Sequence, residues 1–132
     1  MFQYTFKIYY EDTDSGGVVY YANYLKFIER ARTEMINELG FTLTTLLKDY
    51  DLLFLVKKIE CDYIESCKLE DRLNVQSRVL LLKNASFELE QNILKQNNFI
   101  FRSKILMVCV NSRGAPCKIP SELHSLMKNK DG

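Results

Sequence analysis

Apolar and polar positions alternate at the beginning of the chain. The alternation has the period of a strand with one buried face, and its apolar positions are Phe2, Tyr4, Phe6, Ile8 and Tyr10. Gly16 and Gly17 interrupt it, and from about residue 20 apolar positions recur every three or four residues as far as Leu39. That spacing is typical of a helix with one apolar face, and Gly40 stands where a glycine commonly ends a helix. We therefore expect a strand over residues 2–10 and a long helix over residues 20–39.

After Gly40 the pattern is almost entirely that of strands. A short helical segment is expected over residues 43–48. It precedes four long segments with a strand pattern, over Leu52–Cys67, Arg72–Leu82, Ser86–Lys95 and Phe99–Val110. Short connections separate the last three segments, so these should form an antiparallel meander. A final helical turn is expected at Glu122–Lys128, with frayed residues after it.

One helix against a five-stranded antiparallel sheet is an α+β layout. Such a sheet has free strand edges and uncovered apolar surface, which pairing between subunits usually covers. We therefore expect a homo-oligomer, at least a dimer. The 132 residues contain no repeat and no Pro/Gly-rich linker, so a single domain over residues 1–132 is expected, with the last few residues disordered.

Composition argues against several classes of function. The net charge is +1, so nothing favours binding to nucleic acid or to an anionic membrane. No apolar run approaches the roughly 20 residues that span a bilayer, and the first residues carry no signal segment. The four cysteines are far apart and the single histidine is His124, so no common Cys/His metal site is expected. We expect a cytoplasmic, reduced protein with no metal and no cofactor, and with His124 at its surface.

The segment between the first strand and the helix carries the candidate chemistry. Asp14 comes just before the glycine pair, with Ser15 between them, and close to the amino end of the helix, where backbone N–H groups lack partners. Tyr21 stands at the helix start, and its N–H is a candidate donor to a developing oxyanion. A carboxylate and such a donor suffice for thioester hydrolysis, because the thiolate of a thiol with a pKa of about 8.5 leaves almost unaided. The alternative for Asp14 is to cap the Gly16–Gly17 turn, and Asp12 is expected in a turn or solvated role.

The sequence does not match the patterns of a serine hydrolase or of a calcium-binding loop. A serine hydrolase would need a Gly-x-Ser-x-Gly elbow, which the chain lacks. A calcium loop beginning at Asp12 fails at Gly16 and at Asn23, where it needs a ligand and a glutamate.

The same segment resembles a known family. It reads Tyr-Glu-Asp-Thr-Asp-x-Gly-Gly-Val-Val-Tyr-x-Ala-x-Tyr over residues 10–24 and Phe-x-Glu-Arg-Ala-Arg-Thr-Glu over residues 27–34. This motif is similar to that of the hotdog-fold acyl-CoA thioesterases, and more closely to the YbgC-type subgroup related to 4-hydroxybenzoyl-CoA thioesterase. The similarity is strongest over residues 8–35, and the later strand pattern agrees to about residue 119.

The resemblance implies a fold, an assembly and a site. It implies an antiparallel sheet wrapped around the helix, paired subunits with one continuous sheet, a dimer of dimers (a homotetramer), and active sites at the subunit interface. By position, the family's catalytic aspartate falls on Asp14 and its carbonyl-polarising amide on Tyr21. The subgroup usually has histidine at position 21, so activity or substrate choice should differ here if that side chain contributes. Links to the Tol–Pal cell-envelope operon and to acyl carrier protein are further implications.

The expected function is hydrolysis of acyl-CoA to free acid and CoA, with Asp14 as general base or as nucleophile. The rival expectation is a non-catalytic, acyl-carrier-protein-binding subunit of a Tol–Pal-linked assembly. A different hotdog reaction, such as hydration of an acyl chain, is disfavoured because no histidine lies near the motif.

Further residues are expected to bind the substrate, whose acyl group is either aliphatic or aromatic. The substrate-binding candidates are Tyr10, Gly17, Val18, Tyr24 and Glu29. The alternative for the tyrosines is packing with a bonded hydroxyl, and for Glu29 a salt bridge with Arg32. Candidates for holding a coenzyme A phosphate are Lys57, Lys58, Arg72, Arg102, Lys104 and Arg113.

Overall fold

The computed structural model describes residues 1–130, which form one antiparallel sheet and three helices. In chain order the elements are β1 (Phe2–Lys7), a short 3-10 helix (Tyr10–Asp12), α1 (Asn23–Glu38), α2 (Leu43–Tyr50), β2 (Leu53–Tyr63), β3 (Arg72–Leu82), β4 (Ser86–Lys95), β5 (Asn98–Val110) and α3 (Ser121–Lys130). The strand order across the sheet is β1-β3-β4-β5-β2, so β1 and β2 are the two edges. The predicted α+β class and five-stranded antiparallel sheet are confirmed.

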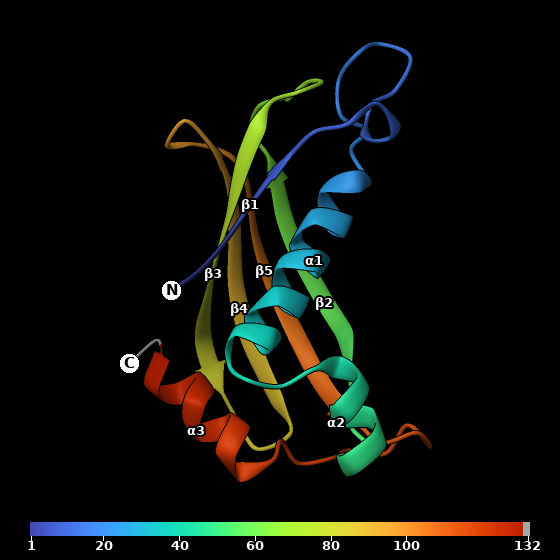
Figure 1. Cartoon of the computed structure of the whole chain (residues 1–132), viewed down its shortest axis with the longest axis vertical. Helices are drawn as coiled ribbons and strands as arrows, with labels where there is room; N and C mark the ends of the chain where they lie inside the picture. Colours follow the sequence, from blue (N-terminus) through green and yellow to red (C-terminus); the bar gives the residue numbers. More distant parts are fainter. Residues whose placement is uncertain (131–132) are drawn as a thin grey trace.

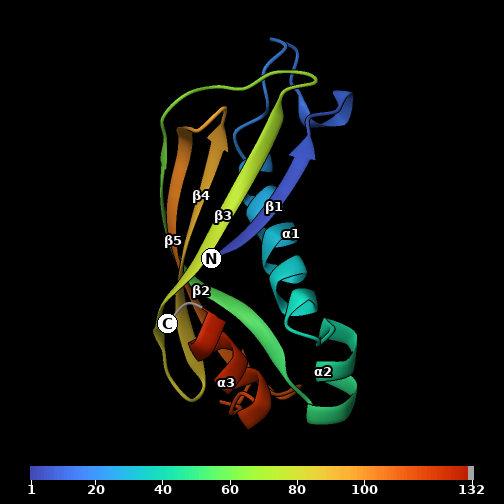
Figure 2. The ribbon, with the colours of Figure 1, turned by 60° about the vertical axis from the view of Figure 1, so that its left-hand side comes forward.

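Helix α1 lies along one face of the sheet, which curves around it (Figures 1 and 2). The apolar positions that predicted this helix are buried, and they include Tyr24, Phe27, Ile28, Ala31, Met35 and Leu39. Gly40 ends the helix in a left-handed conformation with φ of 93°. The Gly40 N–H bonds the Asn37 carbonyl and the Phe41 N–H bonds the Ile36 carbonyl, which is the Schellman arrangement of a helix end. The predicted role of Gly40 is confirmed.

Strands β3 and β4 have the predicted bounds, and β5 begins one residue earlier than predicted. The inward positions Val75, Ser77, Phe87, Leu89 and Gln91 are all buried. The turn between β4 and β5 consists of Gln96 and Asn97, both with positive φ, as expected for a tight two-residue hairpin.

The first strand and the first helix are shorter than predicted. Strand β1 ends at Lys7, and Tyr10 begins the 3-10 helix with 81% of its surface exposed. The chain turns there because the Asp12 carboxylate accepts the Tyr9 N–H at 3.0 Å. Helix α1 begins at Asn23 instead of residue 20.

The carboxyl-terminal ends of β2 and α3 also differ from the predictions. Strand β2 ends at Tyr63 instead of Cys67. Helix α3 continues to Lys130, two residues beyond the predicted end, so fraying directly after Lys128 is wrong. The expected disorder of residues 131–132 lies outside the described residues. None of the helices within residues 1–130 is long and apolar enough to span a bilayer.

A buried polar group joins α1 to the sheet. Gln91 on β4 is fully buried, and its amide N–H groups bond the Ile28 carbonyl and the Ser77 hydroxyl. Its side-chain oxygen accepts from the Arg32 guanidinium at 3.0 Å, and burial lowers the pKa of Arg32. The alternative of a Glu29–Arg32 salt bridge is not found among the described residues. Arg32 therefore anchors the helix to the sheet.

His124 is not the surface histidine that we expected. It lies half-buried on α3, and within the described chain its Nε2 is buried without a hydrogen-bond partner. The helical segment that carries it packs against β3.

Candidate functional site

A tight hairpin before α1 presents Asp14 at its tip. Thr13 and Val19 pair in antiparallel fashion, and the Asp14 N–H donates to the Val18 carbonyl at 2.8 Å. Gly17 closes the turn with φ of 83°, a conformation that favours glycine. The Asp14 Oδ1 accepts the Gly16 N–H at 2.8 Å, and a Cβ on Gly16 would lie 3.2 Å from that oxygen. The Asp14 carboxylate therefore caps the turn and remains exposed.

Two neighbouring segments hold this hairpin in place. Val18 pairs with Lys68, and the Val19 N–H donates to the Cys67 carbonyl at 2.9 Å. The Asp12 carbonyl accepts from the Tyr20 N–H and from the Asn23 side chain. Asp12 is only 7% exposed, so of its two expected roles the structure has the turn role, in a buried position.

The start of α1 leaves two backbone donors open. The N–H groups of Asn23, Tyr24 and Leu25 bond the carbonyls of Tyr20, Tyr21 and Ala22. The N–H groups of Tyr21 and Ala22 have no acceptor among residues 1–130. Tyr21 is 62% exposed. Unpaired donors at a helix start attract negative charge, so this end of α1 can stabilise an oxyanion.

Asp14 and Tyr21 belong to the same end of the molecule, in the loop that enters α1 (blue, at the top of Figure 1). The hairpin register places Asp14 opposite Val18, and Val18 precedes Tyr21 by three residues. Three residues span at most about 10 Å. The cross-strand pair adds about 5 Å, so the backbones of Asp14 and Tyr21 lie within about 15 Å of each other.

Tyrosine rings fill the space beneath this loop. Tyr24 is buried, its hydroxyl lies 3.2 Å from Cys67 Sγ, and its ring stacks on Phe101. Burial raises the pKa of Tyr24 well above its usual value. Tyr63, at the end of β2, donates its hydroxyl proton to the Tyr21 carbonyl at 3.0 Å. We did not identify Tyr63 from the sequence, because it lies 42 residues from Tyr21.

The other residues that the sequence predicted to bind substrate lie partly beside Asp14 and partly elsewhere. Gly17 and Val18 form the Asp14 hairpin, and the Tyr10 carbonyl accepts from the Thr13 N–H and hydroxyl. Tyr24 is packed in the core with its hydroxyl hydrogen-bonded to Cys67, which is the alternative that we gave for the tyrosines. Glu29 instead lines a separate apolar groove of about 350 Å³ beside β2, six residues into the helix. The structure therefore brings Tyr10, Gly17 and Val18 together with Asp14, but not Glu29.

The remaining candidates are residues that could bind a metal ion or a coenzyme A phosphate. Residues 1–130 contain no group of three His, Cys, Asp or Glu side chains arranged to hold a metal ion. Lys58 pairs with Glu60 at 3.0 Å. Arg102 lies 4.4 Å from the centroid of the Phe99 ring, and with Lys104 it lines a surface pocket of about 490 Å³.

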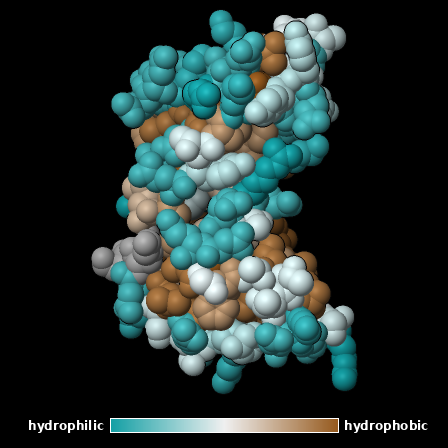
Figure 3. Space-filling model, in the orientation of Figure 1, coloured by the Kyte–Doolittle hydropathy of each residue, from teal (hydrophilic) through white to brown (hydrophobic). Residues whose placement is uncertain are grey.

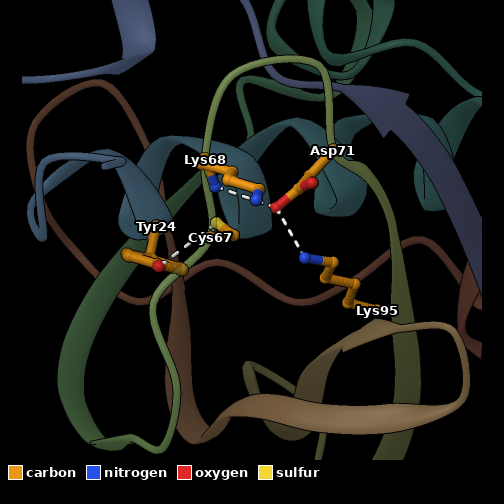
Figure 4. Close-up of polar contacts among 5 residues, drawn as sticks. All are labelled: Tyr24, Cys67, Lys68, Asp71 and Lys95. Atoms are coloured by element: carbon orange, nitrogen blue, oxygen red, sulfur yellow. Dashed lines mark hydrogen bonds and ion pairs between the residues drawn. The ribbon is translucent and has the colours of Figure 1, made fainter. Parts of the chain in front are cut away.

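An ion pair supports the segment that holds the hairpin (Figure 4). The Asp71 carboxylate accepts the Lys68 N–H and pairs with the Lys95 ammonium, both at 2.9 Å. Burial alone would raise the pKa of Asp71. The hydrogen bond from the Lys68 N–H and the charge of Lys95 lower it by more, so the pKa of Asp71 is below its usual value. This carboxylate therefore fixes the turn that pairs with Val18.

We expect Asp71→Asn to lower the free energy of unfolding by about 1 kcal/mol at pH 7. Because the folded-state pKa of Asp71 is lowered, its contribution is present above the unfolded-state pKa near 3.8 and is lost as pH falls through the folded-state pKa. Urea unfolding of both proteins at several pH values measures this. A stability difference that stays constant down to pH 2 would contradict it.

The comparisons with known proteins agree with one another. The family model described as the thioesterase-like superfamily matches residues 9–126. A protein of Haemophilus influenzae named acyl-CoA thioesterase YbgC is 40% identical over 123 residues, which are 92% of this chain and 90% of that protein. The acyl-CoA thioester hydrolase YbgC of Escherichia coli O6:H1 is 36% identical over 84% of this chain and 83% of its own.

Solved structures show the same similarity. The crystal structure of a probable thioesterase from Bartonella henselae has a TM-score of 0.86 and is 31% identical in sequence. The match covers 89% of this chain and 98% of that protein.

Proposed function

Because the chain belongs to the thioesterase-like superfamily, we propose that it is an acyl-CoA thioesterase in which Asp14 and the Tyr21 N–H carry the reaction. The observation that supports the proposal is that the loop entering α1 carries both an exposed carboxylate and a backbone N–H without an acceptor among residues 1–130. The relatives named acyl-CoA thioesterase supply the substrate class.

The reaction needs one proton transfer and one oxyanion. In the first route, Asp14 removes a proton from water while the water oxygen attacks the thioester carbonyl carbon. In the second route, the Asp14 carboxylate attacks that carbon itself and displaces CoA, and water then hydrolyses the resulting mixed anhydride. In both routes the carbonyl oxygen gains negative charge beside the Tyr21 N–H. The C–S bond then breaks, and CoA leaves as a thiolate.

Substrate contacts are part of the same proposal. The hairpin residues Gly17 and Val18, with Tyr10 beside them, would contact the thioester end of the substrate. Tyr24 and Glu29 would contact the substrate further along α1. Tyr24 would do so from the core and Glu29 from the groove beside β2. The whole chain acts as one domain in this proposal, in the cytoplasm.

Thiol release from acyl-CoA tests the proposal directly. The purified protein is mixed with short-chain, long-chain and aromatic acyl-CoA substrates, and free thiol is measured. We expect turnover of at least one of them, and no release from any would overturn the proposed function. Measurable binding to acyl carrier protein without thiol release would instead favour the rival, a binding subunit of a Tol–Pal-linked assembly.

Labelled water distinguishes the two routes. A single turnover in water enriched in oxygen-18 leaves label in the Asp14 carboxylate only if that carboxylate attacks the thioester. With general-base catalysis, the label enters only the released acid.

We also propose that the protein works as a homo-oligomer, a dimer or a dimer of dimers, joined through β2. On the side away from β5, this 11-residue edge strand has no neighbouring strand within residues 1–130. Its exposed apolar side chains are Leu53, Leu55, Val56, Ile59 and Tyr63. Apolar residues are also exposed around the neighbouring α2 (Figure 3). A long apolar edge strand is a surface that a second copy of the sheet can cover.

We expect sedimentation to give at least twice the mass of one chain, and Ile59→Lys to shift the protein toward monomer. A lysine on an edge strand opposes strand pairing because its charge loses hydration. The matched control is Lys57→Arg on the same strand, which keeps the charge. A monomeric wild-type protein at the concentration of the assay would contradict this assembly.

A further inference from the structure

Tyr63 connects the edge of the sheet to the start of α1. It is the last residue of β2 and pairs with Phe101 of β5. Its ring packs edge-on against those of Phe101, Tyr24 and Tyr21, at centroid distances of 5.1, 5.3 and 6.1 Å. The side chain is thus held on three sides, although 44% of the residue surface is exposed.

We propose that Tyr63 is a positioning residue, whose hydroxyl fixes Tyr21 so that its N–H faces the developing oxyanion. This inference rests on the proposed thioesterase function, since it concerns the donor that this function uses. The hydroxyl donates to the Tyr21 carbonyl at 3.0 Å.

The local hydrogen bonds explain why this contact matters. The Tyr21 carbonyl also accepts the Tyr24 N–H, but at a longer 3.4 Å. The first helical bond at Tyr21 is therefore weak, and the Tyr63 hydroxyl is the shorter of the two bonds at this carbonyl. A preorganised donor is what gives an oxyanion site its effect. Without the hydroxyl, the residue that carries the donor would depend on the weak bond and on ring packing.

The Tyr63 hydroxyl can act as this hydrogen-bond donor because it stays protonated. Burial raises the pKa of Tyr63, and the neighbouring Cys61 raises it further. Tyr63 therefore remains a donor across the neutral range, and its effect on the reaction should not change with pH there.

Tyr63→Phe is the direct test, because it removes the hydroxyl and keeps the ring. We expect kcat to fall about 3- to 10-fold, the equivalent of one neutral hydrogen bond, with KM unchanged. The matched control is Tyr50→Phe on α2, which removes an exposed hydroxyl at the other end of the molecule and should leave kcat unchanged. An unchanged kcat in Tyr63→Phe would overturn the inference. So would a Tyr63→Phe protein that fails to fold, because the hydroxyl would then support the fold in place of the donor.

A spectroscopic measurement separates positioning from a general loss of stability. In an Asp14→Asn background, bound acyl-CoA stays intact, and the infrared stretching frequency of its thioester carbonyl reports polarisation by the donor. We expect a smaller shift to low frequency in Asp14→Asn/Tyr63→Phe than in Asp14→Asn alone, and equal shifts would overturn the inference.

The two proposals fail in different ways. Absence of thiol release by the wild-type protein would overturn the proposed function and this inference with it. An active wild-type protein and an inactive Asp14→Asn variant, with full kcat in Tyr63→Phe, would overturn only the inference.

Discussion

Replacing Asp14 by asparagine is expected to lower kcat by about 10²- to 10⁴-fold, the usual effect of losing an essential base. The substitution is close to isosteric, and the asparagine side-chain oxygen can still accept the Gly16 N–H that Asp14 Oδ1 accepts at 2.8 Å. The hairpin should therefore keep its shape while the side chain loses its charge and basicity. Thiol release under saturating acyl-CoA measures the change.

The matched control for this variant is Glu11→Gln. Glu11 is an exposed carboxylate three residues before Asp14, so its neutralisation alters the local charge equally without touching the hairpin tip. We expect kcat of Glu11→Gln within about twofold of wild type. A folded Asp14→Asn variant that keeps more than about a tenth of wild-type turnover would show that Asp14 only caps the turn.

Strands β3 and β4 were the most predictable part of the fold. Buried positions alternate with less buried ones along β4 and the first half of β3, and short turns separate these strands, so the local pattern is enough to predict their bounds. Gly40 was equally predictable, because a left-handed helix end is a local requirement.

The errors arose where specific hydrogen bonds end a strand before its apolar pattern does, one of them local and the other to a distant strand. The alternation of β1 continues to Tyr10 in the sequence, but Asp12 draws the Tyr9 N–H into a turn. The strand pattern of β2 continues to Cys67, but the N–H groups of Ile64 and Glu65 both bond the Ile100 carbonyl, and this ends the regular ladder.

Only the part of the candidate site that is formed by residues close together in the sequence could be predicted. Asp14, the glycine pair and Tyr21 lie within eight residues, so their proximity follows from the sequence. The contact from Tyr63 depends on the register between β2 and β5, and the burial of Tyr24 against Phe101 depends on how α1 packs on the sheet. No motif in the sequence encodes either.

Tyr21→Pro is expected to lower kcat about 10²- to 10³-fold relative to Tyr21→Ala, the effect of removing one oxyanion donor. The Asn23 N–H bonds the Tyr20 carbonyl at 2.9 Å, so residues 20–23 form a turn with Tyr21 second. Proline is favoured at the second position of such a turn. Proline at that position costs no internal bond, since the Tyr21 N–H has no acceptor within residues 1–130.

Comparison with alanine isolates the backbone donor from the side chain. Both variants lose the tyrosine ring and its contacts with Tyr20 and Tyr63, but only the proline variant lacks the N–H. The difference in kcat between them therefore measures what the donor contributes to the transition state, after thermal unfolding has shown that both are folded. Equal kcat values would mean that the Tyr21 N–H does not meet the oxyanion, and the open Ala22 N–H would then be the backbone donor left at this end of α1.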